Sequence, residues 1–313
     1  MSRITTDQLR DAVLDRGSFV SWDREPLAVP ISESYAQELA DARATSGLDE
    51  AVLTGEGRVF GRRVAVVVCE FSFLGGSIGV AAAERITEAV QRATAERLPL
   101  VASPSSGGTR MQEGTVAFLQ MVKIAAAVRL HKQAHLPYLV YLRNPTTGGV
   151  FASWGSLGHV TVAEPGALIG FLGPRVYELL YGEPFPGGVQ TAENLQRHGV
   201  IDGVVALDGL RPTLDRALTV ISDDPEPLPA AQPSAPVPDV PAWASVMASR
   251  RPDRPGVGHL LRHGATDRVL LSGTGQGEAA TTLLALARFA GQPAVVLGQQ
   301  RGGGGLEAAR VGP

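Results

Sequence analysis

The chain has 313 residues, of which 44% are hydrophobic and 19% charged, and its formal net charge is -3. This length fits one large or two ordinary domains with a buried core, and the slightly acidic balance argues against a bulk affinity for nucleic acid or anionic membranes. Cys69 is the only cysteine, which excludes an intramolecular disulfide and a cysteine-based zinc cluster.

Residues 1–50 are predicted to form a polar, helical segment without chemistry of its own. Thr6 is predicted to be the N-cap of a first helix in "TTDQLRDAVLD", and Ser32 or Ser34 that of a second helix ending at Gly47. The charges spread along the first residues differ from the apolar core of a signal peptide, and no run approaches the ~18 apolar residues of a membrane span. We therefore expect a cytoplasmic protein, which the single cysteine also fits.

From residue 51 short apolar runs alternate with longer helical patterns. Strands are predicted at residues 62–71, 98–103 and 136–144 and as a pair within 159–173, and helices at 79–96, 113–133 and 149–158. A regular alternation of apolar strands and helices is typical of an α/β domain whose sheet is covered by helices. One α/β unit is predicted over residues 51–222.

A proline-rich linker is predicted over residues 223–243, because proline favours extended backbone. The remaining residues, 244–313, are predicted to be a separate and incomplete unit. Within it, a strand, a helix and a second strand are predicted at residues 267–273, 278–290 and 291–300. The stretch "GQPAVVLG" repeats the pattern of "GRRVAVVV" at a spacing of 230 residues, which indicates the start of a second copy of the first unit.

Glycine pairs follow predicted strands of the first unit. They are Gly75-Gly76 in "SFLGGSIG", Gly107-Gly108 in "SSGGTR" and Gly148-Gly149 in "NPTTGGVFAS". Loops at the carboxyl ends of the strands line the ligand crevice of an α/β sheet, and glycine lets the backbone approach a ligand closely.

Backbone N–H groups in such turns attract negative charge, which serves either a bound phosphate or an oxyanion that develops during a reaction. A Walker loop needs a Gly-Lys-Ser/Thr ending, and "SSGGTRMQ" has no lysine there. "GGSIGV" has the wrong spacing for a dinucleotide loop. The glycines alone leave three interpretations open: a phosphate site, which these spacings disfavour, an oxyanion site, or purely structural turns.

Candidate nucleophiles and bases lack the expected neighbours. No Gly-x-Ser-x-Gly elbow surrounds the serines, the histidines have no acidic partner at a telling offset, and Cys69 alternates within an apolar strand. Gln112-Glu113 fits a helix cap as well as a catalytic carboxylate. The residues weighed in this way are Ser105, Ser106, Ser153, Ser156, His131, His135, His159 and His198.

From about Phe60 to Val205, close to half of the chain, several motifs occur together in order. They are "GGSIGVAAAERITEAVQRA", "LPLVASPSSGGTRMQEG", "LPYLVYLRNPTTGGVFASWGSLGHV", "GALIGFLGPRV" and "ENLQRHGVIDGVV". This stretch resembles the carboxyltransferase β subunit of bacterial acetyl-CoA carboxylase. The resemblance implies an α/β fold of the ClpP/crotonase type, a spiral superhelix of β-β-α units. It also implies transfer of a carboxyl group from carboxybiotin on a carrier protein to an acyl-CoA, giving malonyl-CoA from acetyl-CoA.

The resemblance assigns roles to the glycine turns. Gly107 and Gly108 would present one backbone donor, and Gly148 and Gly149 the other, to the oxygen of a thioester enolate. The loop with Gly75, Gly76 and Ser77 would line the CoA cleft together with Thr147, and Arg110 would hold its turn or approach a CoA phosphate. The stretch Gly173, Pro174, Arg175 is implied to be architecture.

The resemblance also implies partners. Biotin would be carried on a separate carrier protein, and the chain would work with biotin carboxylase, the biotin carboxyl carrier protein and an α-type half or second protomer, in a homo- or hetero-oligomer. The four-cysteine zinc domain of some family members has no counterpart here, so no zinc is predicted. From about Arg250 the chain resembles the start of the α subunit, without its oxyanion hole.

Other functions stay open from the sequence. The β subunit of malonate decarboxylase has the same turns and acts on a malonyl thioester of a carrier protein. A catalytically incomplete assembly subunit would keep the fold and its contact surface. The α-like start and the Gly-Pro-Arg stretch favour the carboxylase.

Overall fold

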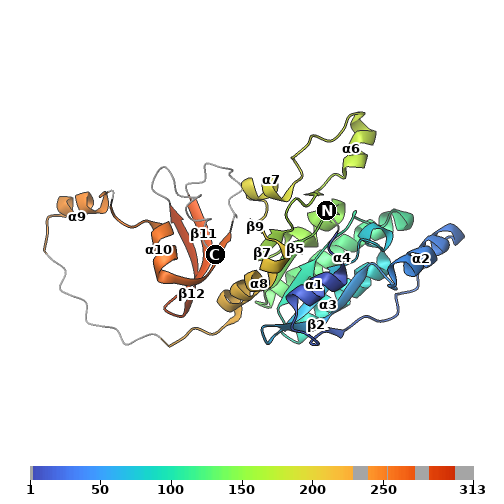
Figure 1. Cartoon of the computed structure of the whole chain (residues 1–313), viewed down its shortest axis with the longest axis horizontal. Helices are drawn as coiled ribbons and strands as arrows, with labels where there is room; N and C mark the ends of the chain where they lie inside the picture. The colour runs from blue at the N-terminus through green and yellow to red at the C-terminus, as the bar shows by residue number, and fades with distance from the viewer. Residues whose placement is uncertain (1–2, 228–238, 252, 272–281, 300–313) are drawn as a thin grey trace.

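The computed structural model describes residues 3–227, 239–251, 253–271 and 282–299 (Figure 1). The first unit is built on a seven-stranded sheet with the order β1-β2-β3-β4-β5-β7-β9. β1 to β3 pair antiparallel, and β3, β4, β5, β7 and β9 run parallel. The strands are β1 Val20–Ser21, β2 Val52–Val59, β3 Arg62–Cys69, β4 Leu100–Ser103, β5 Tyr138–Leu142, β7 Val160–Ala163 and β9 Gly203–Val204.

Helices cover both faces of this sheet, as the alternation of strands and helices predicted. The helices of this unit are α1 Thr6–Val13, α2 Glu33–Ser46, α3 Val80–Ala95, α4 Gly114–Gln133, α5 Gly148–Ala152, α6 Pro174–Tyr181, α7 Ala192–Arg197 and α8 Leu207–Ser222. Alternate residues of β3 point to opposite faces. Val67 packs in the cluster with α3 and α4, and Val66 in the cluster with α1 and α8.

The predicted helix boundaries of the N-terminal segment hold with one correction. The N-cap of α1 is Thr5 and not Thr6, because the Thr5 side chain accepts from the Gln8 N–H while the Gln8 side chain accepts from the Thr5 N–H. Ser32 caps α2, which ends at Gly47 in a left-handed conformation, as predicted.

Short elements stand at the carboxyl edge of the parallel strands. They are β6 Thr146–Thr147 and β8 Ile169–Gly170, which pair with each other, and the 3-10 turns η1 Leu74–Gly76, η2 Met111–Glu113 and η3 Trp154–Ser156. The predicted strand pair within residues 159–173 is therefore split between two sheets, since β7 belongs to the main sheet and β8 to the small one.

The C-terminal part contains a three-stranded antiparallel sheet of β10 Ala265–Leu271, β11 Thr282–Phe289 and β12 Gln292–Gln299, with α10 Val257–Gly264 beside it, whereas α9 Ala242–Ser249 lies away from this sheet (Figure 1). The helix predicted at residues 278–290 is wrong over the described residues, because 282–289 pair along their whole length with β12. A short run of Leu and Ala fits a helix or a buried strand equally well. Residues 278–281 lie outside the described residues.

One hairpin of the first unit recurs in the C-terminal part. The strands of β2-β3 and of β11-β12 are all eight residues long, and Thr282 lies 230 residues after Val52. Both two-residue turns have positive φ angles, at Phe60 and Gly61 in one and at Ala290 and Gly291 in the other. The structure thus reproduces the spacing noted in the sequence, whereas the predicted domain boundaries stay predictions.

The proline-rich stretch predicted as a linker falls largely on residues 228–238, outside the described residues. Helix α8, which precedes this stretch, contacts β10 and β11, which follow it, and Leu286 of β11 packs in the cluster beneath α8. Among the described helices, none is both long enough and apolar enough to span a membrane.

Candidate active site

Backbone hydrogen bonds join the loops that follow β3, β4 and β5. The Gly107 N–H donates to the Gly75 carbonyl (2.9 Å), and the Thr147 N–H donates to the Ser106 carbonyl (2.9 Å). β6 then pairs with β8, which brings in the loop after β7. All of the predicted glycine turns therefore meet at the carboxyl edge of the sheet, where an α/β fold places its ligand site.

The turn after β4 uses its N–H groups within the protein. The Gly107 N–H donates to the Gly75 carbonyl, and the Gly108 N–H donates to the Ser106 hydroxyl oxygen at 3.0 Å. Gly108 has a φ of 118°, a conformation that favours glycine. The role of Gly107 and Gly108 as oxyanion donors stays a prediction.

The turn after β5 has free donors. Gly148 and Gly149 begin α5, so their N–H groups have no partner inside the helix. Among the described residues, neither N–H donates a hydrogen bond to another group. Both glycines are partly exposed. Unpaired donors of this kind suit an oxyanion, and that role stays a prediction for Gly148 and Gly149.

The two turns touch each other through their glycines. A Cβ atom placed on Gly148 would lie 3.5 Å from the Cα of Gly108, and one placed on Gly108 would lie 3.8 Å from the Cα of Gly148. Gly148 has a φ of 64°. The atoms nearest to a Cβ at Gly108 or Gly148 all belong to the backbone, so the two turns meet backbone to backbone.

The Gly75-Gly76 loop is held against the turn after β4. Gly76 has a φ of 63°, and a Cβ atom there would lie 2.0 Å from the Ser105 carbonyl oxygen, so only glycine fits. The Ser77 hydroxyl contacts the Arg110 side chain at 3.4 Å. The Gly75-Gly76 pair thus shapes the loop, while its contact with CoA stays a prediction.

Arg110 is a buried residue that holds its turn, which corrects the other predicted role, an approach to a CoA phosphate. Its side chain is 1% exposed and pairs with the buried Glu50, donating to one carboxylate oxygen at 3.0 Å. It also donates to the Tyr35 hydroxyl (3.2 Å) and the Ser77 carbonyl (2.8 Å). Burial works against the charge, but Glu50 and Tyr35 raise the pKa of Arg110 above its ordinary value. A guanidinium enclosed in this way holds the turn and cannot reach a CoA phosphate.

Thr147 is likewise turned into the protein. Its side chain is buried, and its hydroxyl donates to the Ser106 carbonyl at 3.4 Å. Its side chain is therefore not available to CoA, which corrects the predicted contact, although its backbone leads directly into the Gly148 turn.

The side chains set aside as nucleophiles are structural here. Cys69 is fully buried, and burial raises the pKa of its thiol to about 11. His131 is also fully buried, where its ring contacts the Thr94 hydroxyl and the Pro137 carbonyl, and burial lowers its pKa. Among the described residues no three His, Cys, Asp or Glu side chains gather as a metal site requires.

Sequence reasoning missed the residues that hold Arg110. Tyr35 and Glu50 come from the segment predicted to carry no chemistry, and no pattern around them signals their contacts. Glu113 is different, because the sequence left it open between a helix cap and a catalytic carboxylate, and in the structure it accepts from the Val80 N–H at the start of α3 (2.6 Å).

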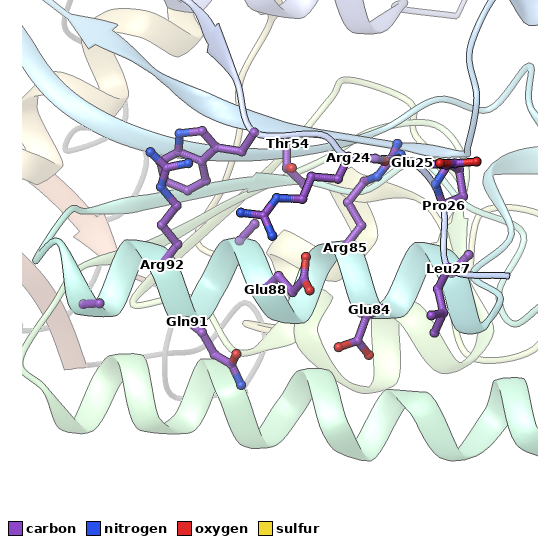
Figure 2. Close-up of a pocket in the computed structure, with 14 residues that line it drawn as sticks. Arg24, Glu25, Pro26, Leu27, Thr54, Glu84, Arg85, Glu88, Gln91 and Arg92 are labelled. Carbon is purple, nitrogen blue, oxygen red and sulfur yellow. Dashed lines mark hydrogen bonds between the residues drawn. The ribbon is translucent and has the colours of Figure 1, made fainter.

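A groove of about 510 Å³ lies elsewhere, along α3 (Figure 2). Arg92 stacks on the Trp22 ring at 4.3 Å, and Arg24 extends across the groove above Glu88. Its lining contains none of the predicted glycine turns. This groove and the predicted site are thus different places on the molecule.

The main sheet is mixed, and the loops at the carboxyl ends of its parallel strands form a second small sheet and glycine turns. This arrangement is that of the ClpP/crotonase-like class. The carboxyl transferase domain model matches residues 12–309 of the chain. The chain therefore belongs to the carboxyl transferase domain family, as the sequence motifs predicted.

Relatives with curated descriptions agree with this assignment. The chain is 84% identical to the probable biotin-dependent acyl-coenzyme A carboxylase beta3 subunit of Mycobacterium tuberculosis, over its whole length and 63% of that protein. It is 46% identical over 202 residues to the acetyl-coenzyme A carboxylase carboxyl transferase subunit beta of Sinorhizobium medicae, covering 64% of this chain and 66% of that one. The chain thus spans slightly less than two thirds of these relatives.

Solved structures confirm the predicted fold. A transcarboxylase 12S structure matches 94% of this chain and 56% of its own with a TM-score of 0.73 at 19% identity. A single-chain, multi-domain long-chain acyl-CoA carboxylase matches 95% of this chain and 29% of its own with a TM-score of 0.67 at 18% identity.

Proposed function

We propose that this chain carries the β-type carboxyltransferase site of a biotin-dependent acyl-CoA carboxylase, with acetyl-CoA or a related acyl-CoA as acceptor. The observation that supports this most is the pair of free N–H groups of Gly148 and Gly149 beside the Gly108 turn. The names of the curated relatives supply the reaction class and the dependence on biotin.

The role of the backbone follows from where charge develops. Removing the α-proton of a thioester places negative charge on its carbonyl oxygen, and N–H groups aimed at that oxygen stabilise the enolate as it forms. The unpaired N–H groups of Gly148 and Gly149, which lie beside the Gly108 turn, fit this task. Loss of one such donor costs about 3–4 kcal/mol in other enzymes.

The second substrate would come from the other half of the enzyme. Carboxylated biotin, when bound in the α-type half, would supply the carboxyl group that forms the new carbon–carbon bond, and the biotin nitrogen that this group leaves would take up the α-proton of the thioester. A reaction of this kind requires no side-chain nucleophile from this chain.

We further propose that the chain works with biotin carboxylase, a biotin carboxyl carrier protein and an α-type half or second protomer. The test is reconstitution of the full-length protein with these partners, followed by assay of acetyl-CoA, propionyl-CoA and longer acyl-CoAs. Carboxylation of an acyl-CoA supports the proposal. Inactivity on every CoA ester combined with decarboxylation of a malonyl carrier protein would overturn it.

A further inference from the structure

Helix α2 packs on the loop that carries Gly75 and Gly76. It lies at the edge of the first unit, away from the main sheet (Figure 1). Its buried residues Tyr35, Leu39 and Ala42 form a small cluster of their own with Phe73 and Ala51, and the partly buried Leu74 packs against it. Leu74 begins η1. The apolar face of α2 is therefore occupied by this loop.

The polar contacts of α2 extend to the turn after β4. The Tyr35 hydroxyl donates to one carboxylate oxygen of Glu113 at 2.6 Å and accepts from Arg110 at 3.2 Å. The other carboxylate oxygen of Glu113 accepts from the Val80 N–H, where α3 begins after the Gly75-Gly76 loop. The side chains of Arg110 and Glu113 are 1% and 7% exposed. One buried hydroxyl thus joins α2, the turn after β4 and the start of α3.

Movement of either loop would be passed to the donors of the site. The Ile78 N–H donates to the Gly108 carbonyl (3.0 Å), and the Arg110 N–H donates to the Ile78 carbonyl (2.9 Å). Gly108 therefore cannot shift unless the loop after β3 shifts as well. Donors for an oxyanion act only when they are fixed before the reaction.

We infer that α2 is a clamp for this site and that Tyr35 and Glu113 are positioning residues, which hold the turn with Gly108 against the Gly75-Gly76 loop. The inference rests on the proposed function for its catalytic consequence, but the clamp itself can be observed without any substrate. Burial and the bond to Glu113 raise the pKa of Tyr35, so its hydroxyl keeps the proton that it donates.

Amide hydrogen exchange on the full-length protein tests the clamp. Tyr35→Phe removes the hydroxyl and keeps the ring in its cluster. Tyr141→Phe is the matched control, because the Tyr141 hydroxyl is also bonded to protein, at the Val205 carbonyl, but on the opposite face of the sheet. We expect exchange in residues 74–79 and 106–113 to rise about tenfold in Tyr35→Phe and to stay unchanged in Tyr141→Phe. Unchanged exchange in Tyr35→Phe would overturn the inference.

Kinetics then separate positioning from loss of stability. With an active acyl-CoA assay, Tyr35→Phe is expected to lower kcat about tenfold with little change in KM, whereas Tyr141→Phe keeps both. Glu113→Gln is expected to loosen the same segments. The double variant is expected to lose less than the sum of the two single variants, because the residues share one contact, while Tyr35 also bonds to Arg110 and Glu113 also accepts from the Val80 N–H. Additive effects would contradict a shared clamp. The two proposals can fail separately. If Tyr35→Phe raises the exchange of these segments but the wild-type protein carboxylates no acyl-CoA, the clamp is supported and the proposed function is refuted.

Discussion

Replacing Gly148 by alanine separates the shape of the site from the stability of the fold. Gly148 and Gly166 have nearly the same φ angles, 64° and 70°, so alanine at either position costs about 1–2 kcal/mol of folding free energy. Nothing lies within 4 Å of a Cβ atom on Gly166, whereas one on Gly148 lies 3.5 Å from the Gly108 Cα and 3.7 Å from the Gly107 carbonyl oxygen. These are ordinary contacts, so Gly148→Ala folds, but its methyl group occupies the gap between the turns.

The expected results differ sharply between the two variants. Both should lower the melting temperature equally, by about 2–4 °C per kcal/mol. Only Gly148→Ala should lose activity, because its methyl group keeps the thioester oxygen away from N–H groups that are still present; the loss in kcat should be similar to the about 10²–10³-fold that removing one oxyanion donor costs. Melting curves and acyl-CoA carboxylation by the reconstituted enzyme measure both quantities. Equal activity of the two variants would refute the oxyanion role of this turn.

Further substitutions test the frame. Gly76→Ala should destabilise the loop more than Gly75→Ala does, because its Cβ atom would lie 2.0 Å from the Ser105 carbonyl oxygen, and equal melting temperatures would contradict this. Glu50→Ala should cost about 3–5 kcal/mol in denaturant unfolding, since it removes the nearest carboxylate of a buried arginine and leaves only Glu113, at 3.7 Å; a loss below 1 kcal/mol would show that the pair is dispensable. Burial lowers the pKa of His131, so the unfolded chain takes up a proton first and stability should fall as pH drops below about 6.5. His131→Gln should flatten that slope between pH 7 and 5, and an unchanged slope would assign it to other groups.

Much of the fold follows from local patterns. The short apolar run at 62–71 and the long stretch of helix-forming residues at 113–133 are clear local signals, and the structure places β3 and α4 there. The error at 278–290 has a physical cause. β11 is a strand because it pairs with β10 on one side and β12 on the other, and both partners lie outside this stretch of sequence. A short run of leucine and alanine does not itself indicate that such partner strands exist.

The site could be predicted in part. Glycine pairs after strands marked the loops correctly, since the carboxyl ends of parallel strands share one edge. Whether an N–H is free depends on contacts across loops, so the pairing of the Gly107 N–H with Gly75 could not be foreseen. The role of Arg110 also depends on Glu50, which lies 60 residues earlier in the chain.

The most direct test of the central claim is the stretching frequency of a thioester carbonyl bound to this site. A CoA thioester labelled with ¹³C at the carbonyl, bound to the assembled enzyme, can be followed by difference infrared spectroscopy. Donation from the Gly148 and Gly149 N–H groups predicts a shift to lower frequency in the wild type and a much smaller shift in Gly148→Ala. A bound thioester whose carbonyl frequency equals that in water would contradict the account.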